Sequence, residues 1–434
     1  MTTSEPTWER PDPGIHRTTE GVPEPPDRPG PLEGLRVVEL ASEYAAFCGR
    51  LLADYGAEVI LVEPPGGAPQ RHYGPFVDDA PDPERSLYWW HYNTSKRGVV
   101  LNLDSPDDRE RFVALTRAAD VVLEGEQPGR LASLGIDHDR IRGDHPELIW
   151  VSVTAFGRDT SRAHEPFTDL TLLAGGGPVW SCGYDDHSIP PVRGGGNQAF
   201  QIGSTFAVMG ALTALLHRDV SGTGQFLDVS MHAAANVTTE SGTFDWLVAQ
   251  STVIRQTGRH ALNTVTQETQ VRCADGKYVT TGFPPRHVKD FISLRDWIDS
   301  PGLREQFDDI VLLDLAVERG GVSLADLRTD PLVTEIYGAG RSGLVFLAEH
   351  LTADEFFRGA QSRGLATGAV WSPEEALFNE HFVARGFPVE VEHDDLGRTV
   401  TYPGAPFRAP AAPWRISRRA PHVAEHQAEV LGNS

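Results

Sequence analysis

The chain has 434 residues, of which 40% are hydrophobic and 23% charged, so it is long and apolar enough to bury the cores of two ordinary domains. Its formal net charge of -23 argues against nucleic acid or an anionic membrane as a partner, because both require a basic footprint. A small anionic ligand stays possible, since it needs only a local cluster of cations. No apolar run approaches 18 residues and no charged-then-apolar leader opens the chain, so we expect a cytoplasmic protein without a membrane span.

Two further features of the composition bear on the class of protein. The three cysteines, Cys48, Cys182 and Cys273, are odd in number and far apart, which predicts reduced thiols rather than a disulfide framework or a clustered metal site. Residues 1–30 hold seven prolines and almost no apolar pattern, so we expect them to form a disordered tail outside the fold.

The first part of the fold is predicted to contain parallel crossover units. Residues 35–40 indicate a buried strand, residues 47–55 a helix and residues 56–63 a second strand, and this order implies a parallel pair. Further segments follow: strands at residues 99–104, 120–124 and 148–153, a helix at residues 107–118, and later helices at residues 289–299, 342–351 and 354–363.

The stretch from residue 190 to residue 235 predicts a loop, a helix, a tight turn and a strand. Five large apolar residues recur every three or four positions in the helix and are predicted to pack inward: Ile202, Phe206, Met209, Leu212 and Leu216. The helix is expected to end near His217, because the glycine-containing run at residues 221–224 breaks it. A strand is predicted directly after that run, at residues 226–231.

Several of these segments resemble family III CoA-transferases, also called the CaiB/BaiF family, which includes formyl-CoA and carnitine CoA-transferases and alpha-methylacyl-CoA racemases. Residues 56–65 are similar to the motif that closes the family's first crossover, and residues 192–225 are similar to its Val-Arg, glycine-loop, helix and Gly-x-Gly-Gln segment. The resemblance covers about residues 31–431. It implies an α/β fold with a Rossmann-like large domain, a smaller α+β domain and an interlocked dimer.

This resemblance also divides the chain. After the tail of residues 1–30, it implies that residues 31–235 form the first part of a large CoA-binding domain. Residues 236–375 would form linker helices and the small domain, and residues 376–434 would return to the large domain.

The resemblance assigns five residues to coenzyme A, which enters the reaction as a substrate. They are Arg71, Asn93, Lys96, Arg97 and Leu101, in a pattern similar to the family's Asn-x-x-Lys-Arg before Leu-Asp-Leu. The chemistry agrees, because coenzyme A carries three phosphate groups and Lys or Arg at a loop rim can pair with them. The alternative is a solvated basic turn.

The catalytic residue is not evident from the sequence. In the transferases, an aspartate immediately before the long helix is the nucleophile, and counting without gaps places Phe200 at that position. Phenylalanine has no lone pair for covalent catalysis. Thr168 stands where the racemases carry a proton-transferring histidine. Asp169 follows it, and we consider two roles for Asp169: a replacement nucleophile, or a cap for the helix that starts near Leu170.

The resemblance implies an acyl-CoA:carboxylate CoA-transferase whose partners are an acyl-CoA and a carboxylic acid, with no metal. The phenylalanine at position 200 leaves three hypotheses for the function. The first is a transferase with a relocated carboxylate, and the second is a non-catalytic subunit that pairs with an active paralogue. The third is a racemase, which the missing histidine and aspartate oppose. Both a homodimer and a heterodimer with a related subunit stay open.

One motif near the end of the chain has metal-ligand spacing. His422, Glu425 and His426 match the His-x-x-Glu-His pattern of inverted zinc proteases. Relatives carry a similar sequence for structural reasons, so we expect a structural role.

Overall fold

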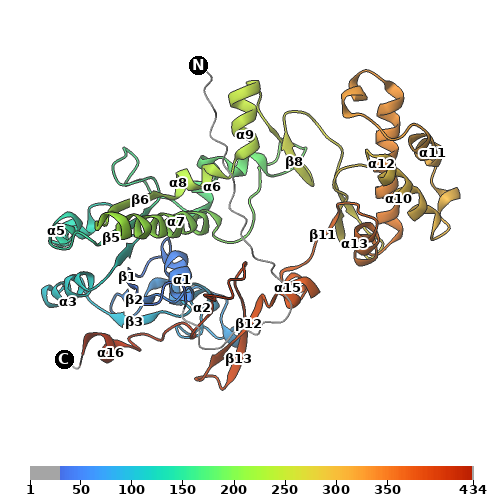
Figure 1. Cartoon of the computed structure of the whole chain (residues 1–434). Coiled ribbons are helices and arrows are strands. Elements are labelled where there is room, and N and C mark those ends of the chain that lie inside the picture. Colours follow the sequence, from blue (N-terminus) through green and yellow to red (C-terminus); the bar gives the residue numbers. More distant parts are fainter. Residues whose placement is uncertain (1–29, 433–434) are drawn as a thin grey trace, which may run out of the picture.

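The computed structural model describes residues 30–432, and six parallel strands form its central sheet (Figure 1). The strand order is β3-β2-β1-β4-β5-β6. The strands are β1 (Arg36–Leu40), β2 (Glu58–Glu63), β3 (Arg97–Val100), β4 (Val121–Glu124), β5 (Ile149–Thr154) and β6 (Phe226–Ser230). The predicted parallel crossovers and Rossmann-like sheet are confirmed. The predicted tail lies outside the described residues, except for Gly30.

Helices cover both faces of this sheet. Alternate residues of each buried strand point to opposite faces, so each strand contributes to two cores. Val37 and Val59 face a core shared with α1 and α7, whereas Val38 and Ile60 face a core that contains Phe112 of α3. The helices of this part are α1 (Ala46–Asp54), α2 (Leu87–Tyr92), α3 (Pro106–Arg117), α4 (Arg130–Ser133), α5 (His138–Asp144), α6 (Asp169–Gly176), α7 (Gln198–Ser221), α8 (Met231–Val237) and α9 (Glu240–Phe244).

The inward face of α7 is rich in small residues, and the predicted inward face is wrong at Met209 and Leu216, although Leu212 packs against the core as predicted. Met209 and Leu216 are 53% and 69% exposed. The buried face is offset from them and includes Ala199, Gly203, Ser204, Ala207, Ala211 and Ala214. A Cβ on Gly203 would lie 2.6 Å from Cγ of Met231 in α8, so small side chains allow the helices to approach closely. Met209 and Leu216 are left on the outer surface, while Phe200, Val208 and Leu215 are buried beside the small residues.

The same helix is long and apolar enough to cross a membrane by length and composition alone. Half of its most apolar stretch is buried within the protein, where it packs on β5, β6 and neighbouring helices. This packing is typical of a core helix.

A second body with its own core follows in sequence, and Figure 1 shows it at the right, apart from the sheet. Its elements are β9 (Gln270–Arg272), β10 (Tyr278–Thr280), α10 (Val288–Asp299), α11 (Ile310–Glu318), α12 (Pro331–His350), α13 (Ala353–Ser362) and β11 (Gly368–Ala369). Before it, the chain forms the hairpin of β7 (Ile254–Gln256) and β8 (Arg259–Leu262). The domain boundaries near residues 235 and 375 stay a prediction.

The C-terminal segment returns to the edge of the central sheet. It contains α14 (Pro373–Leu377), α15 (Glu380–Arg385), the hairpin of β12 (Pro388–His393) and β13 (Arg398–Pro403), and α16 (Gln427–Leu431). The side chain of Gln427 bonds to both the N–H (2.7 Å) and the C=O (3.0 Å) of Val100 in β3. Residues far apart in sequence thereby complete one structural unit.

Candidate active site

The candidate active site is a crevice at the carboxyl ends of the central strands. In doubly wound sheets, ligands bind where the strand order reverses, and here that point lies between β1 and β4. A cavity of about 480 Å³ opens there, lined by the loops that follow β1, β2, β3 and β4. A larger cavity of about 760 Å³ lies at the amino ends of the strands. Because Arg36 and Arg97 in its wall already pair with Glu58, we place the site at the carboxyl edge.

Arg71, predicted to contact coenzyme A, is fully buried. Its guanidinium donates two hydrogen bonds to Glu63, at 2.7 and 2.8 Å, and others to Glu84 (2.8 Å) and to the carbonyl of Pro421 (2.9 Å). It also lies 3.9 Å from the ring centroid of Trp89. As placed, Arg71 joins the end of β2 to the returning C-terminal segment and has no exposed surface for a phosphate.

Lys96 and Asn93 are buried in a second internal network. The Lys96 Nζ lies 2.8 Å from Glu39, 3.0 Å from the Asn93 Oδ1 and 3.0 Å from the carbonyl of Ala46. Burial raises the pKa of Glu39 to about 7, against the opposing effect of Lys96, and burial lowers the pKa of Lys96. The ammonium of Lys96 is therefore bound by groups inside the protein.

Arg97 and Leu101 lie at opposite ends of β3. Arg97 begins the strand and pairs with Glu58 (3.1 Å) and Glu429 (2.9 Å), whereas Leu101 follows the strand and lines the crevice. The strand predicted at residues 99–104 is observed at Arg97–Val100, and in both cases Arg97 lies at the amino end of the strand, the edge opposite its ligand crevice. Contact of the five predicted residues with coenzyme A stays a prediction, and only Leu101 lines the described cavity.

The crevice carries more carboxylates than cations. Arg130 is the one Lys or Arg among its described lining residues, and it pairs with Asp104 at 3.0 Å. The lining also includes Glu43, Glu63 and Glu126. Phosphate groups that enter this crevice would meet a net negative wall.

Phe200, at the position of the family nucleophile, is part of an aromatic cluster. It is 6% exposed and lies in the first turn of α7. Its ring centroid is 5.1 Å from that of Tyr44 and 6.4 Å from that of Phe167, in edge-on arrangements that stabilise aromatic pairs. The phenylalanine is therefore packed against the loop after β1.

Asp169 holds the start of α7 in place. Its Oδ1 accepts a hydrogen bond of 2.7 Å from the N–H of Ala199, and its Oδ2 lies 3.2 Å from Arg193. Burial raises the pKa of Asp169, while the backbone hydrogen bonds and Arg193 oppose that shift. The predicted cap for α6 is wrong by one residue, because Thr168 caps that helix; Asp169 instead caps α7 across the fold.

A hydrogen-bonded chain that the sequence analysis missed links the crevice to α7. The Tyr88 hydroxyl donates to Glu43 Oε1 at 3.0 Å and accepts from Asn197 at 2.8 Å. Gln201, one turn into α7, donates to the hydroxyl of Tyr92 at 3.0 Å. Burial raises the pKa of Glu43, and the nearby charge of Asp169 adds to the rise while Tyr88 opposes it.

Only a weak sequence signal pointed to Glu43. It follows the buried strand β1 by three residues, and loops after parallel strands carry functional side chains. Its partners Tyr88 and Asn197 lie 45 residues or more away in the chain, so no local pattern connects the three.

The histidines of the His-x-x-Glu-His motif have separate partners. His422 lies 2.8 Å from Glu84, whereas His426 bonds to the N–H of Gly98 (3.2 Å) and to Arg418 (3.1 Å). His426 fastens the C-terminal segment to β3, and His422 fastens it to the loop before α2, so both make structural contacts, as predicted.

The His422 and Glu84 pair predicts a pH-dependent contribution to stability. The hydrogen bond to Glu84 raises the pKa of His422, so this contribution is complete below about pH 6.5 and is lost as the pH rises through the raised value. Burial acts to raise the pKa of Glu84, but the hydrogen bond from His422, together with the other polar partners of this carboxylate, outweighs burial and lowers it. The contribution of Glu84 to stability is therefore present above about pH 4.5 and is lost as the pH falls through the lowered pKa. We expect the difference in thermal midpoint between wild type and His422→Gln to be largest between those values. A difference independent of pH would contradict this assignment.

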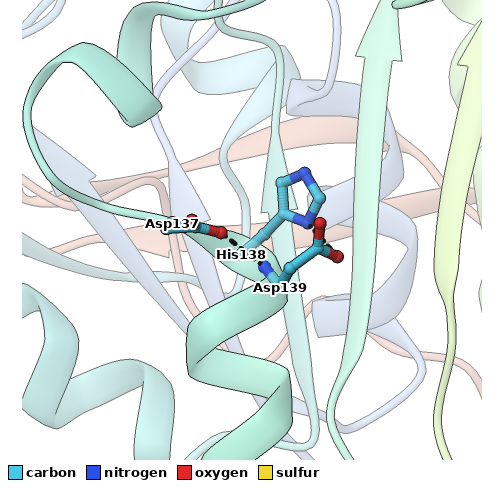
Figure 2. Close-up of side chains that lie close together, drawn as sticks. All are labelled: Asp137, His138 and Asp139. Carbon is cyan, nitrogen blue, oxygen red and sulfur yellow. Dashed lines mark hydrogen bonds and ion pairs between the residues drawn. The ribbon is translucent and has the colours of Figure 1, made fainter.

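Figure 2 shows another cluster of potential metal ligands, Asp137, His138 and Asp139. Asp137 caps α5 through the N–H groups of Asp139 (2.9 Å) and Arg140 (3.3 Å). The ring of His138 stacks on Phe226, which begins β6 at the amino edge of the sheet. The cluster therefore lies at the edge opposite the crevice and serves to start the helix.

The family comparison covers most of the chain. The model of CoA-transferase family III matches residues 32–310 and 342–427, so the chain belongs to this family and the sequence-based identification is confirmed. The subunit BbsE of succinyl-CoA:(R)-benzylsuccinate CoA-transferase from Thauera aromatica is 31% identical over 398 residues, covering 91% of this chain and 92% of the relative. The succinyl-CoA:mesaconate CoA-transferase of Haloarcula marismortui is 28% identical, with 93% and 96% covered.

A solved structure supports the fold independently. The crystal structure of a CaiB/BaiF family protein from Brucella suis aligns with a TM-score of 0.74 at 23% identity, over 93% of this chain and 100% of that chain. At this identity the likeness concerns the fold alone.

Proposed function

We propose that the chain acts in the transfer of coenzyme A between an acyl-CoA thioester and a carboxylic acid, with a nucleophile at a position other than 200. The observation that carries this proposal is similarity to CoA-transferases over nine-tenths of the chain, combined with a crevice at the carboxyl edge of its sheet. The buried ring of Phe200 cannot attack a thioester, so the carboxylate must come from elsewhere in the assembly.

A dimer of this chain with a family member is part of the proposal. The outer face of α7 exposes Met209, Leu216 and Val220, and the turn after α9 exposes Trp246 and Leu247. Apolar groups of this size gathered on exposed surfaces mark interaction sites in soluble proteins. We infer that a second chain of the family covers these surfaces.

A second candidate function is that of a non-catalytic subunit beside an active paralogue. The charge of the crevice favours it, because Arg130 is the only Lys or Arg in the described lining and it is already paired. The predicted phosphate ligands Arg71 and Lys96 are occupied inside the protein. The similar protein from Thauera aromatica is itself named as a subunit.

Asp169 is poorly placed to be the replacement nucleophile. Its Oδ1 accepts the Ala199 N–H and its Oδ2 faces Arg193, so an attack on a thioester would sacrifice the cap of α7. This geometry favours a nucleophilic carboxylate from another residue of this chain or from a partner subunit.

Native mass spectrometry of the tagged protein from its own cells, with succinyl-CoA added, tests the proposal. A homodimer that gains a covalent mass supports an active enzyme, whereas a heterodimer whose partner gains that mass supports the non-catalytic subunit. If the chain neither assembles with a family member nor supports CoA transfer, both the active enzyme and the non-catalytic subunit are contradicted.

A further inference from the structure

We propose that Glu43 is the carboxylate with which this chain attacks a CoA thioester. The inference rests on the first form of the proposed function, in which the chain is itself active. Glu43 lines the crevice from the loop after β1, beside the switch point of the sheet.

The other carboxylates of the crevice are committed or less well placed. Glu63 is fully buried and receives two hydrogen bonds from Arg71, and Asp104 pairs with Arg130. Glu43 and Glu126 have no ion-pair partner within 4.0 Å among residues 30–432. A nucleophile must keep a lone pair free for the substrate, so these two are the available candidates.

The hydrogen-bonded chain distinguishes Glu43 from Glu126. Tyr88 joins the Glu43 carboxylate to Asn197, the residue directly before α7. The charge of Asp169, whose carboxylate caps α7, also reaches Glu43. Among the described residues, Glu43 is thus the crevice carboxylate without an ion-pair partner that is connected to the start of α7.

The surroundings of Glu43 suit a nucleophile. Tyr88 fixes Oε1, while Oε2 accepts no hydrogen bond from the residues that the structure describes, so it is free to attack. Half-burial raises the pKa of Glu43, which makes its carboxylate more basic than one in water. Tyr44 and Tyr73 line the same cavity, and each carries a hydroxyl group that can donate a hydrogen bond.

The reaction balances with this one residue. Oε2 attacks the thioester carbon and the C–S bond breaks, which gives an acyl–Glu43 anhydride and the CoA thiolate. The thiolate attacks the Glu43 carbonyl carbon of the anhydride, the donor acid leaves as its carboxylate, and a Glu43–CoA thioester remains. The acceptor carboxylate then attacks this thioester to give an anhydride and thiolate. The thiolate finally attacks the acceptor carbon, which forms the new thioester and restores Glu43 without net proton or electron transfer.

Trapping of the covalent intermediate tests the role of Glu43. The protein, in the assembly in which it is isolated, is mixed with succinyl-CoA, treated with borohydride and mapped by peptide mass spectrometry. We expect a reduced thioester on Glu43. We also expect Glu43→Gln to abolish it and to lower the transfer rate by at least about 1,000-fold, as for loss of other nucleophiles. The near-isosteric amide keeps the hydrogen bond with Tyr88, so circular dichroism and CoA affinity serve to show an intact fold.

A matched control lies outside the crevice. Glu390 of β12 also accepts a hydrogen bond from a hydroxyl, that of Thr401 at 2.6 Å, so Glu390→Gln removes a comparable charge. This variant should retain the adduct and full transfer. An adduct on Glu126 or Asp169, or transfer that continues without any adduct on this chain, would overturn the role of Glu43 while leaving CoA transfer by the assembly intact. Absence of transfer in every assembly would instead reject the proposed function itself.

Discussion

Replacement of Arg71 with methionine is expected to lower the free energy of unfolding by about 3–5 kcal/mol. The substitution leaves the Glu63 carboxylate, which is fully buried, without its cation. It also removes the hydrogen bond to the carbonyl of Pro421, which attaches the C-terminal segment to the end of β2. The loss of the cation that pairs with a buried charge costs far more than the loss of a surface ion pair, because water cannot replace that cation. Urea unfolding followed by tryptophan fluorescence, at one protein concentration, measures the loss.

Arg97→Met is the matched control for that experiment. Arg97 also forms two ion pairs, but its side chain is 29% exposed and its partners are 31% and 54% exposed. Its replacement should change the free energy of unfolding by less than about 1 kcal/mol. If Arg71→Met instead kept the wild-type stability and weakened only the binding of coenzyme A, the arginine would face the phosphate groups, as the family motif implies.

The sheet could be predicted from the sequence because its signals are local. Apolar runs such as residues 35–40 and 56–63 specify buried parallel strands on their own, and the helix between them follows from its periodicity. The inward face of α7 could not be read this way. Periodicity favours large apolar residues such as Met209 and Leu216, whereas close packing on α8 selects the small residues Gly203 and Ala207.

The site was predicted only in part, for two physical reasons. Charge and motif spacing identify Arg71 and Lys96 as cations, but whether a cation faces a ligand or a buried glutamate depends on tertiary contacts. Motif spacing also does not say which edge of the sheet a residue occupies, and Arg97 lies at the amino end of β3, opposite the crevice. The link from Glu43 to Tyr88 and Asn197 is long-range throughout and leaves no pattern in the chain.

Phe200→Asp restores the family residue. We expect this substitution to destabilise the protein rather than to give it CoA-transferase activity. Phenylalanine packs against Tyr44 and Phe167, and loss of a buried aromatic ring costs about 3–5 kcal/mol. The introduced carboxyl group would also lie at the start of α7, beside the Asp169 carboxylate that already caps this helix. Two carboxylates at one desolvated site cannot both ionise without a penalty.

The pH dependence of this variant separates packing from charge. Burial and the neighbouring Asp169 should raise the pKa of the introduced carboxyl group above its unfolded value. The folded variant then binds the proton more tightly than the unfolded chain, so the loss of stability should grow as the pH rises through that raised pKa. Phe200→Leu, which changes packing without charge, should show a smaller loss that does not vary with pH. A Phe200→Asp protein that is as stable as wild type at pH 8, and that gains a CoA adduct at position 200, would mean that this crevice still accommodates the family nucleophile, and that Phe200 alone silenced it.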